Sequence, residues 1–117
     1  MSTGVDAITA YFAAIRARDA GALSDLFTED AELVSAAGTF SGRDAIVRFY
    51  RDLAFTVDDL WPEPGDLIVD GDRVAVEIRL RMAGVTTLVG DVFTLSDGRI
   101  ARVAIYTGPQ VTDTGTA

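Results

Sequence analysis

The chain has 117 residues, 49% of them hydrophobic, and its 18 acidic and 10 basic side chains give a net charge of −8. This length suits a single domain with a hydrophobic core of its own. The sequence contains no Cys, His, Lys or Asn. These absences exclude a Ser-His-Asp triad, Schiff-base chemistry, thiolate nucleophiles and zinc sites with nitrogen or sulfur ligands. Any chemistry therefore falls to Asp, Glu, Tyr, Ser, Arg and backbone groups.

The acidic charge and the lack of long apolar runs also predict which partners the protein has and where it is located. An acidic surface lacks the basic face that would offset nucleic-acid phosphates, so no nucleic-acid partner is expected. No apolar run approaches the roughly 20 residues that span a bilayer, and residues 1–4 do not resemble a signal peptide. We therefore expect no membrane association and a cytoplasmic protein; the absence of Cys fits a reducing compartment. All ten basic residues are Arg, which suggests a GC-rich bacterial genome.

The first half of the chain predicts helices. Val5, Ile8, Phe12 and Ile15 recur at three- and four-residue spacing, which predicts an amphipathic helix with Tyr11 on its buried side.

Two further helices are expected, separated by a short strand at 31–35. Asp19 is the predicted N-cap of the second helix. Ser41, with Asp44 three residues later, forms a predicted capping box for the third. The buried face of the third helix is expected to carry Ile46, Phe49, Tyr50 and Leu53.

The second half predicts an antiparallel sheet. Strands are expected at 67–69, 73–82, 85–95 and 100–107, separated by Gly- and Asp-containing turns. The segment 61–65 contains two prolines and cannot lie inside a central strand. We expect a single domain over 1–117, with its core at about 5–108 and a loose tail at 109–117.

Helices followed by a meandering sheet indicate an α+β fold in which three helices cover the apolar face of the sheet. A curved sheet around a long helix would leave a conical apolar pocket. Trp61 is expected near its mouth, where simple packing is the alternative. The predicted pocket residues are Phe12, Leu33, Phe49, Trp61, Val76, Ile78, Leu80, Val89, Phe93, Val103 and Ile105.

One charged residue interrupts the apolar face of the strand at 85–95. Asp91 shares that face with Val89 and Phe93. Burial there would raise the pKa of the carboxyl and favour its neutral, hydrogen-bond-donating form. Tyr11 and Tyr50 are the other donors expected to point inward. The alternatives are an Asp that meets water or bonds to a helix, and tyrosines that only fill the core.

Four segments resemble ketosteroid isomerases: YFAAI at 11–15, LFTEDA at 26–31, AIVRFY at 45–50 and GDVF at 90–93. These enzymes belong to the nuclear transport factor two superfamily, with polyketide cyclases, limonene-type epoxide hydrolases and non-catalytic binders. The resemblance extends from about residue 5 to residue 108. It implies a cone of curved antiparallel sheet closed by three helices and dimeric through the sheet. Nothing in the sequence calls for a metal or an organic cofactor.

The resemblance also implies roles for individual residues. Tyr11 and Asp91 would form an oxyanion hole for a substrate oxygen, and Tyr50 would hydrogen-bond to Tyr11. The family carries its general base, an Asp, on the first strand; an ungapped alignment of LFTEDA places Ser35 there. A serine without His or Lys beside it is a poor base. Glu32 has the opposite strand parity and is expected to point outward.

The base is therefore either lost or supplied by another carboxylate. Asp58, Asp59 and Glu63 lie in the loop before the sheet and are candidate substitutes, although exposed carboxylates in loops are usually only solvated.

Three functions remain open after the sequence is read. The favoured one is an enzyme that enolises, isomerises or cyclises an apolar carbonyl compound, steroid or polyketide-like. A non-catalytic small-molecule-binding module is second, since Ser35 replaces the usual base. An epoxide hydrolase or cyclase-type relative ranks lower, because it needs several carboxylates in the pocket and only Asp91 is expected to point inward.

Overall fold

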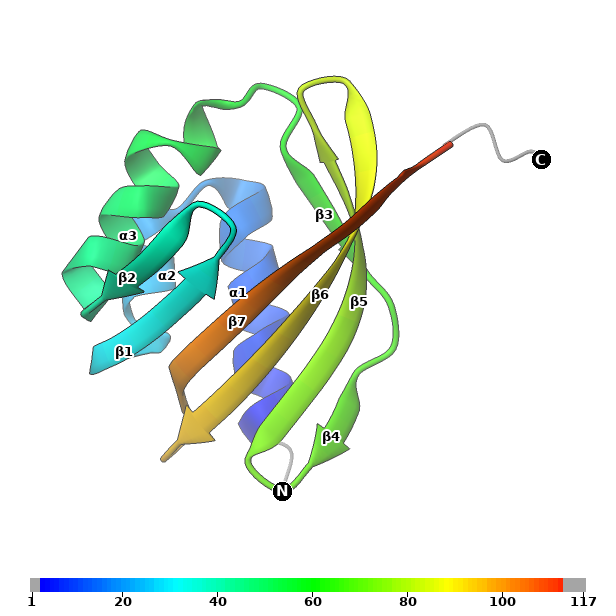
Figure 1. The fold of residues 1–117 in the computed structure, drawn as a ribbon. Helices are drawn as coiled ribbons and strands as arrows, with labels where there is room; N and C mark the ends of the chain where they lie inside the picture. The colour runs from blue at the N-terminus through cyan, green and yellow to red at the C-terminus, as the bar shows by residue number, and fades with distance from the viewer. Residues whose placement is uncertain (1–2, 113–117) are drawn as a thin grey trace.

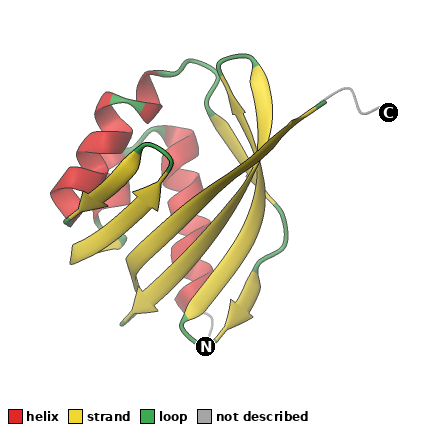
Figure 2. Ribbon diagram, viewed as in Figure 1, coloured by secondary structure: helices red, strands yellow, loops and turns green. Residues whose placement is uncertain are grey.

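A curved, unclosed sheet of seven strands wraps around three helices in the computed structural model, which describes residues 3–112 (Figure 1). The helices lie together on the concave side of the sheet (Figure 2). The predicted α+β fold is confirmed. One strand pair is parallel, β1 (Phe27–Ser35) with β7 (Arg99–Val111), whereas the other pairs are antiparallel.

The three predicted helices are present as α1 (Thr3–Ala17), α2 (Ala20–Ser24) and α3 (Arg43–Asp52), and a 3₁₀ turn, η1 (Ala54–Thr56), follows α3. The apolar stripe of α1 is buried against the sheet, as its spacing predicts. The buried residues of this stripe include Ile8, Tyr11, Phe12 and Ile15. Within residues 3–112, none of the helices has the length and apolar character needed to cross a membrane.

The N-terminus of α2 is capped as predicted. The backbone N–H of Ala22 donates to Oδ1 of Asp19 at 3.0 Å. This bond satisfies one of the amide groups that a helix leaves without a partner in its first turn. Asp19→Ala is expected to lower the free energy of unfolding by about 1 kcal/mol, as measured by urea denaturation. Asp19→Asn, which keeps the accepting oxygen, should cost clearly less.

The N-terminus of α3 differs from the prediction. Its N-cap is Gly42, with φ +94°, and no side chain caps it, so the capping box predicted at Ser41 is wrong. Ser41 instead ends a short strand that pairs with β1. The N–H of Gly42 donates to the carbonyl of Ala31 at 2.7 Å. Glycine tolerates this positive φ, which makes the turn from strand to helix possible.

The sheet has the order β2-β1-β7-β6-β5-β3, with β4 also paired to β5. Its central strands are long, and β5 begins and ends as predicted. The strands are β1 (Phe27–Ser35), β2 (Gly38–Ser41), β3 (Trp61–Pro64), β4 (Ile68–Asp70), β5 (Arg73–Met82), β6 (Val85–Ser96) and β7 (Arg99–Val111). The two-proline segment forms β3, an edge strand, where the missing N–H groups are tolerated.

The largest differences from the predicted strands are at β1, β2 and the end of β7, while β4, β6 and the start of β7 differ by one residue. β1 starts four residues earlier than predicted, and β2 was not predicted at all. β7 continues to Val111, so residues 109–111 are not a loose tail. A Cβ atom at Gly108 would lie only 2.9 Å from the carbonyl oxygen of Leu88, which shows that this glycine allows β7 to pass close to β6. The predicted tail at 113–117 lies outside the described residues.

Candidate functional site

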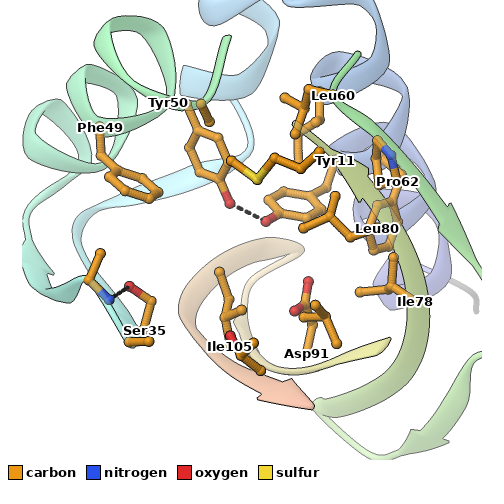
Figure 3. Close-up of a pocket in the computed structure, with 18 residues that line it drawn as sticks. Tyr11, Ser35, Phe49, Tyr50, Leu60, Pro62, Ile78, Leu80, Asp91 and Ile105 are labelled. Carbon is orange, nitrogen blue, oxygen red and sulfur yellow. Dashed lines mark hydrogen bonds between the residues drawn. The ribbon is translucent and has the colours of Figure 1, made fainter. Parts of the chain in front are cut away.

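An apolar cavity of about 270 Å³ lies between the helices and the concave face of the sheet (Figure 3). Its wall is formed by side chains from helices α1 and α3, the β1–β2 turn, the segment before β3, and strands β5, β6 and β7. The lining residues are Tyr11, Phe12, Ile15, Ser35, Ala36, Ala37, Phe49, Tyr50, Ala54, Leu60, Pro62, Ile78, Leu80, Met82, Val89, Asp91, Ile105 and Thr107.

Two tyrosine hydroxyls meet at one side of this cavity. Tyr11 comes from the middle of α1 and Tyr50 from the last turns of α3, and their hydroxyls are hydrogen-bonded to each other. The Tyr11 ring makes edge-to-face contacts with Phe12, Phe27 and Phe93, which fix its orientation. Tyr11 is only 1% exposed. Burial raises the pKa of both hydroxyls well above 10, so both keep their protons at neutral pH.

Asp91 points into the same cavity from β6 (Figure 3). Its cross-strand neighbours are Val76 on β5 and Ile105 on β7, so it lies in an apolar part of the sheet. The residue is 4% exposed, and its Oδ1 has no hydrogen-bond partner among residues 3–112. Burial raises the pKa of this carboxyl from 3.8 to about 7. Both of its protonation states are therefore populated near neutral pH.

The tyrosine pair and Asp91 influence one another electrostatically. Burial and the interaction with Tyr50 are the larger causes of the raised Tyr11 pKa, and the charge of Asp91 adds to them. Burial is also the largest cause of the raised Tyr50 pKa, and the charge of Asp91 raises it further. The cavity thus holds two hydroxyls that remain protonated beside one carboxyl that can exchange a proton. A ligand oxygen beside Tyr11 would meet a hydrogen-bond donor, and a nearby carbon or hydroxyl proton could be accepted by Asp91.

Ser35 lies in the cavity lining at the β1–β2 turn, but its hydroxyl is engaged within that turn. The hydroxyl donates to the carbonyl of Gly38 and accepts from the N–H of Ala37, each at 3.2 Å. No basic side chain accompanies it in the lining of the described cavity. Glu32 points away, where it pairs with Arg102 at 3.3 Å.

The carboxylates of the loop before the sheet stand outside the cavity. Asp58, Asp59 and Glu63 are absent from its lining, so among residues 3–112 Asp91 is the one carboxyl that faces the cavity. The carboxylate of Asp59 instead accepts the N–H groups of Ala83 and Gly84. Over the same described range, no three Asp or Glu side chains are grouped so that they could hold a metal ion.

The predicted pocket residues divide into two groups. Six of them line the cavity: Phe12, Phe49, Ile78, Leu80, Val89 and Ile105. The structure places the other five elsewhere. Four are buried in the core outside this lining, namely Leu33, Val76, Phe93 and Val103.

Trp61, the fifth, points outward and is 45% exposed, with the Arg16 guanidinium 4.7 Å from its ring centre. Its neighbours Leu60 and Pro62 line the cavity in its place. Strand parity indicated the correct face of the sheet, but it could not show how far along each strand the cavity extends. The sequence could have indicated that Pro62 faces the cavity, because neighbouring residues in a strand point to opposite sides and Trp61 points outward.

Comparisons with known proteins agree with this fold. Residues 8–103 match the model of the SnoaL-like domain. A protein of Sinorhizobium meliloti described provisionally as a polyketide cyclase is 31% identical, with a TM-score of 0.79 over 86% of this chain and 93% of that chain. A protein of Kribbella flavida described provisionally as a ketosteroid isomerase is 18% identical, with a TM-score of 0.83 over 100% and 85%.

A third structure is TerC, co-crystallised with polyporic acid. It is 23% identical, with a TM-score of 0.76 over 90% of this chain and 91% of that chain. Comparison with curated protein sequences gave no significant match. The match to the family model over most of the chain and the likeness to the Sinorhizobium protein lead to one conclusion: the chain belongs to the SnoaL-like domain family, within the nuclear transport factor two-like superfamily.

Proposed function

We propose that this protein binds a small apolar carbonyl compound in the cavity and catalyses its enolisation, leading to a double-bond shift or a ring closure. The observation that carries the proposal is the Asp91 carboxyl, buried with an unpartnered oxygen in an otherwise apolar cavity that also holds the Tyr11 and Tyr50 hydroxyls. Support also comes from the 31% identical relative described provisionally as a polyketide cyclase. TerC, which has the same fold, was co-crystallised with polyporic acid.

Tyr11 is the proposed donor to the substrate oxygen. If Tyr50 donates to Tyr11, the Tyr11 proton remains free for a ligand oxygen inside the cavity. A donor that is fixed in place before the reaction stabilises the negative charge that develops on the oxygen of an enolate. Its raised pKa keeps Tyr11 a donor, rather than a phenolate, throughout the reaction.

Asp91 is the proposed proton carrier. In its ionised form it takes a proton from the carbon next to the carbonyl, and the electron pair of the broken C–H bond forms the enolate. The neutral acid then returns the proton to another carbon, which completes a double-bond shift. The family resemblance assigns Asp91 a neutral donor role instead. That role needs a separate base, and the lining residues between 3 and 112 offer no second carboxyl.

The size and lining of the cavity limit the substrate. A volume of about 270 Å³ lies just below the range of about 300–1,000 Å³ that is common for small-molecule pockets. Its wall is almost wholly apolar apart from the tyrosine pair, Asp91, Ser35 and Thr107. We therefore propose a compact, uncharged compound of two or three fused rings with one enolisable carbonyl group. The proposed reaction uses no metal and no organic cofactor.

Deuterium exchange tests this proposal. The probe is 2-tetralone, a two-ring ketone, incubated in heavy water at neutral pH while NMR follows the loss of protons next to the carbonyl. The wild type is expected to accelerate exchange above the buffer rate. Asp91→Asn should lower this acceleration by about 100-fold or more, since proton transfer by a positioned group is worth about 10²–10⁴. Tyr11→Phe should lower it by about 10²–10³, as for other oxyanion donors.

Two matched controls accompany these variants. Tyr106→Phe makes the same change at a tyrosine that is 62% exposed, and Asp58→Asn makes the same change at an exposed carboxylate. Both should keep the wild-type rate. Exchange that persists in both Asp91→Asn and Tyr11→Phe would contradict the proposed chemistry.

A binding module without turnover is the second candidate, favoured by the engagement of Ser35 within its own turn. Its probe is 2-naphthol, which has the carbon skeleton of the 2-tetralone enol and carries one hydroxyl. Binding of 2-naphthol that depends on Tyr11, together with no exchange of 2-tetralone in the wild type, would support this candidate over the enzyme.

We also propose a homodimer that forms through the outer face of the sheet, where the exposed Tyr106 lies. Light scattering during gel filtration would measure its mass directly; a monomer at high protein concentration would contradict it. A cytoplasmic location remains a prediction from the sequence.

A further inference from the structure

One wall of the cavity is a segment with little secondary structure of its own. Residues 54–62, here called the mouth segment, connect α3 to β3 and pass beside the β5–β6 turn (Figure 1). The mouth segment contributes Ala54, Leu60 and Pro62 to the cavity lining. It contains only the short 3₁₀ turn η1 and the start of edge strand β3. Side chains from other parts of the chain must therefore fix much of its position.

Arg18 holds the mouth segment from the side of α1. Its Nη2 donates to the carbonyls of Val57 at 2.7 Å and Asp58 at 2.9 Å, and its Nε donates to Phe55 at 3.3 Å. The backbone of Arg18 has φ +54°, in the left-handed region. A residue just past the end of a helix is usually glycine when it adopts this conformation, because other residues are strained there. The three carbonyl contacts give a physical reason for arginine at this position.

Asp59 holds the mouth segment from the side of the sheet. Its two carboxylate oxygens accept the N–H of Ala83 at 2.7 Å and the N–H of Gly84 at 2.8 Å, at the tip of the β5–β6 turn. Both turn residues have positive φ, +54° and +82°, and successive amides in such turns can point at one anion. The Gly84 amide is the largest cause that lowers the pKa of Asp59. Strand β5, which leads into this turn, brings Met82 to the cavity wall.

We propose that Arg18 and Asp59 form a clamp that keeps the mouth segment closed against the cavity and thereby controls how fast a ligand enters and leaves. The ligand part of this inference rests on the proposed function, in which a small apolar compound occupies the cavity. Arg18 and Asp59 are absent from the cavity lining, so they act as positioning residues through Leu60 and Pro62. If either residue loses its contacts, the mouth segment moves away from the cavity, and a ligand both enters and leaves faster by the same opening.

The mouth segment carries a built-in reporter. Trp61 is the only tryptophan in the chain, and it lies at the β3 end of the segment. Arg16 fixes this end, since its Nε donates to the carbonyl of Pro62 at 2.9 Å and its guanidinium lies over the Trp61 ring. Fluorescence quenching of Trp61 by acrylamide therefore reports motion of the mouth segment without any ligand. Hydrogen exchange of the amides in residues 54–62 gives a second, direct measure.

The test compares Arg18→Gly and Asp59→Asn with the control Asp58→Asn. Glycine suits the left-handed backbone at position 18, so Arg18→Gly removes the clamp while it relieves strain. Asp59→Asn keeps the size of the side chain, but the amide cannot accept both N–H groups equally, and Asp58→Asn makes the same charge change one residue away. In both clamp variants we expect faster Trp61 quenching and faster amide exchange in residues 54–62.

Stopped-flow binding of 2-naphthol should show association and dissociation rates that both rise about tenfold in the clamp variants, with an affinity within about threefold of the wild type. A lid that blocks both directions predicts this pattern, whereas simple loss of stability does not. The proposal is overturned if both clamp variants match Asp58→Asn in quenching, amide exchange and 2-naphthol rates. If the proposed function fails, 2-naphthol either does not bind or binds independently of Tyr11. Faster Trp61 quenching in the clamp variants would still support the clamp in that case.

Discussion

The free energy of unfolding of Asp91→Asn, relative to that of the wild type, is expected to rise by about 4 kcal/mol between pH 4 and pH 8. The folded protein raises the pKa of the Asp91 carboxyl from 3.8 to about 7 because the carboxyl is buried in an apolar environment. The folded state therefore still holds the proton in a pH range where the unfolded chain has released it. The stability that this group contributes is complete below about pH 4 and is lost as the pH rises through 7.

Asn cannot ionise, so the variant escapes this loss. Groups elsewhere titrate equally in both proteins, and their effects cancel in the difference between the two free energies of unfolding. Urea denaturation at pH 4, 6 and 8 measures that difference. Asp58→Asn, which makes the same change at an exposed carboxylate, serves as the control. If the difference in free energy of unfolding between Asp91→Asn and the wild type stays constant from pH 4 to pH 8, the Asp91 carboxyl is solvated.

Ser35→Asp is expected to create isomerase activity on a two-ring β,γ-unsaturated ketone or to raise it by about 10²–10⁴. Position 35 lies in the cavity lining, and in ketosteroid isomerases, which the chain resembles, the first strand carries the Asp base. A carboxylate at this position would add the second proton-transfer group that the cavity lacks. The turn should tolerate the change, because an Asp oxygen can accept the Ala37 N–H as the Ser35 hydroxyl does.

The measurement is the conversion of a two-ring β,γ-unsaturated ketone to its conjugated enone, followed by ultraviolet absorbance. Ser35→Asn is the matched control, because it keeps the side-chain shape and the turn bond but supplies no base. Equal rates for Ser35→Asp and Ser35→Asn would contradict the prediction. Adding Tyr11→Phe to Ser35→Asp should remove most of the gained activity, since the enolate then loses its donor.

Local patterns were enough to predict most of the secondary structure. The apolar spacing of α1, the Asp19 cap and the strict alternation along β5 are all patterns among residues close in sequence. β2 escaped prediction because it is only four residues long and has a single large apolar residue, Phe40, so its pairing with β1 is the main sign of a strand. The end of β7 escaped because Gly108 and Pro109 resemble a strand terminator, whereas here the glycine permits close passage beside Leu88.

The polar residues of the site were predictable for a similar reason. Asp91 stands out against an apolar alternation, and helical spacing places Tyr11 and Tyr50 on buried faces. That their hydroxyls meet was implied by the family resemblance, and the structure shows the bond.

The clamp had no signal in the sequence. The Arg18 contacts join a side chain to backbone atoms 37–40 residues away. Backbone acceptors have no sequence signature, so only the folded geometry reveals such a contact.

The most direct test of the account is the pH dependence of 2-tetralone deuterium exchange between pH 5 and 9. If ionised Asp91 removes the proton, kcat/KM should rise with pH and reach half its maximum near 7, the raised pKa of this carboxyl. Asp91→Asn should lack this rise. A rate that falls above pH 7 would instead assign Asp91 the role of neutral donor and require another base. A wild-type profile without a transition near 7, or one shared by Asp91→Asn, would contradict the claim that Asp91 carries the proton.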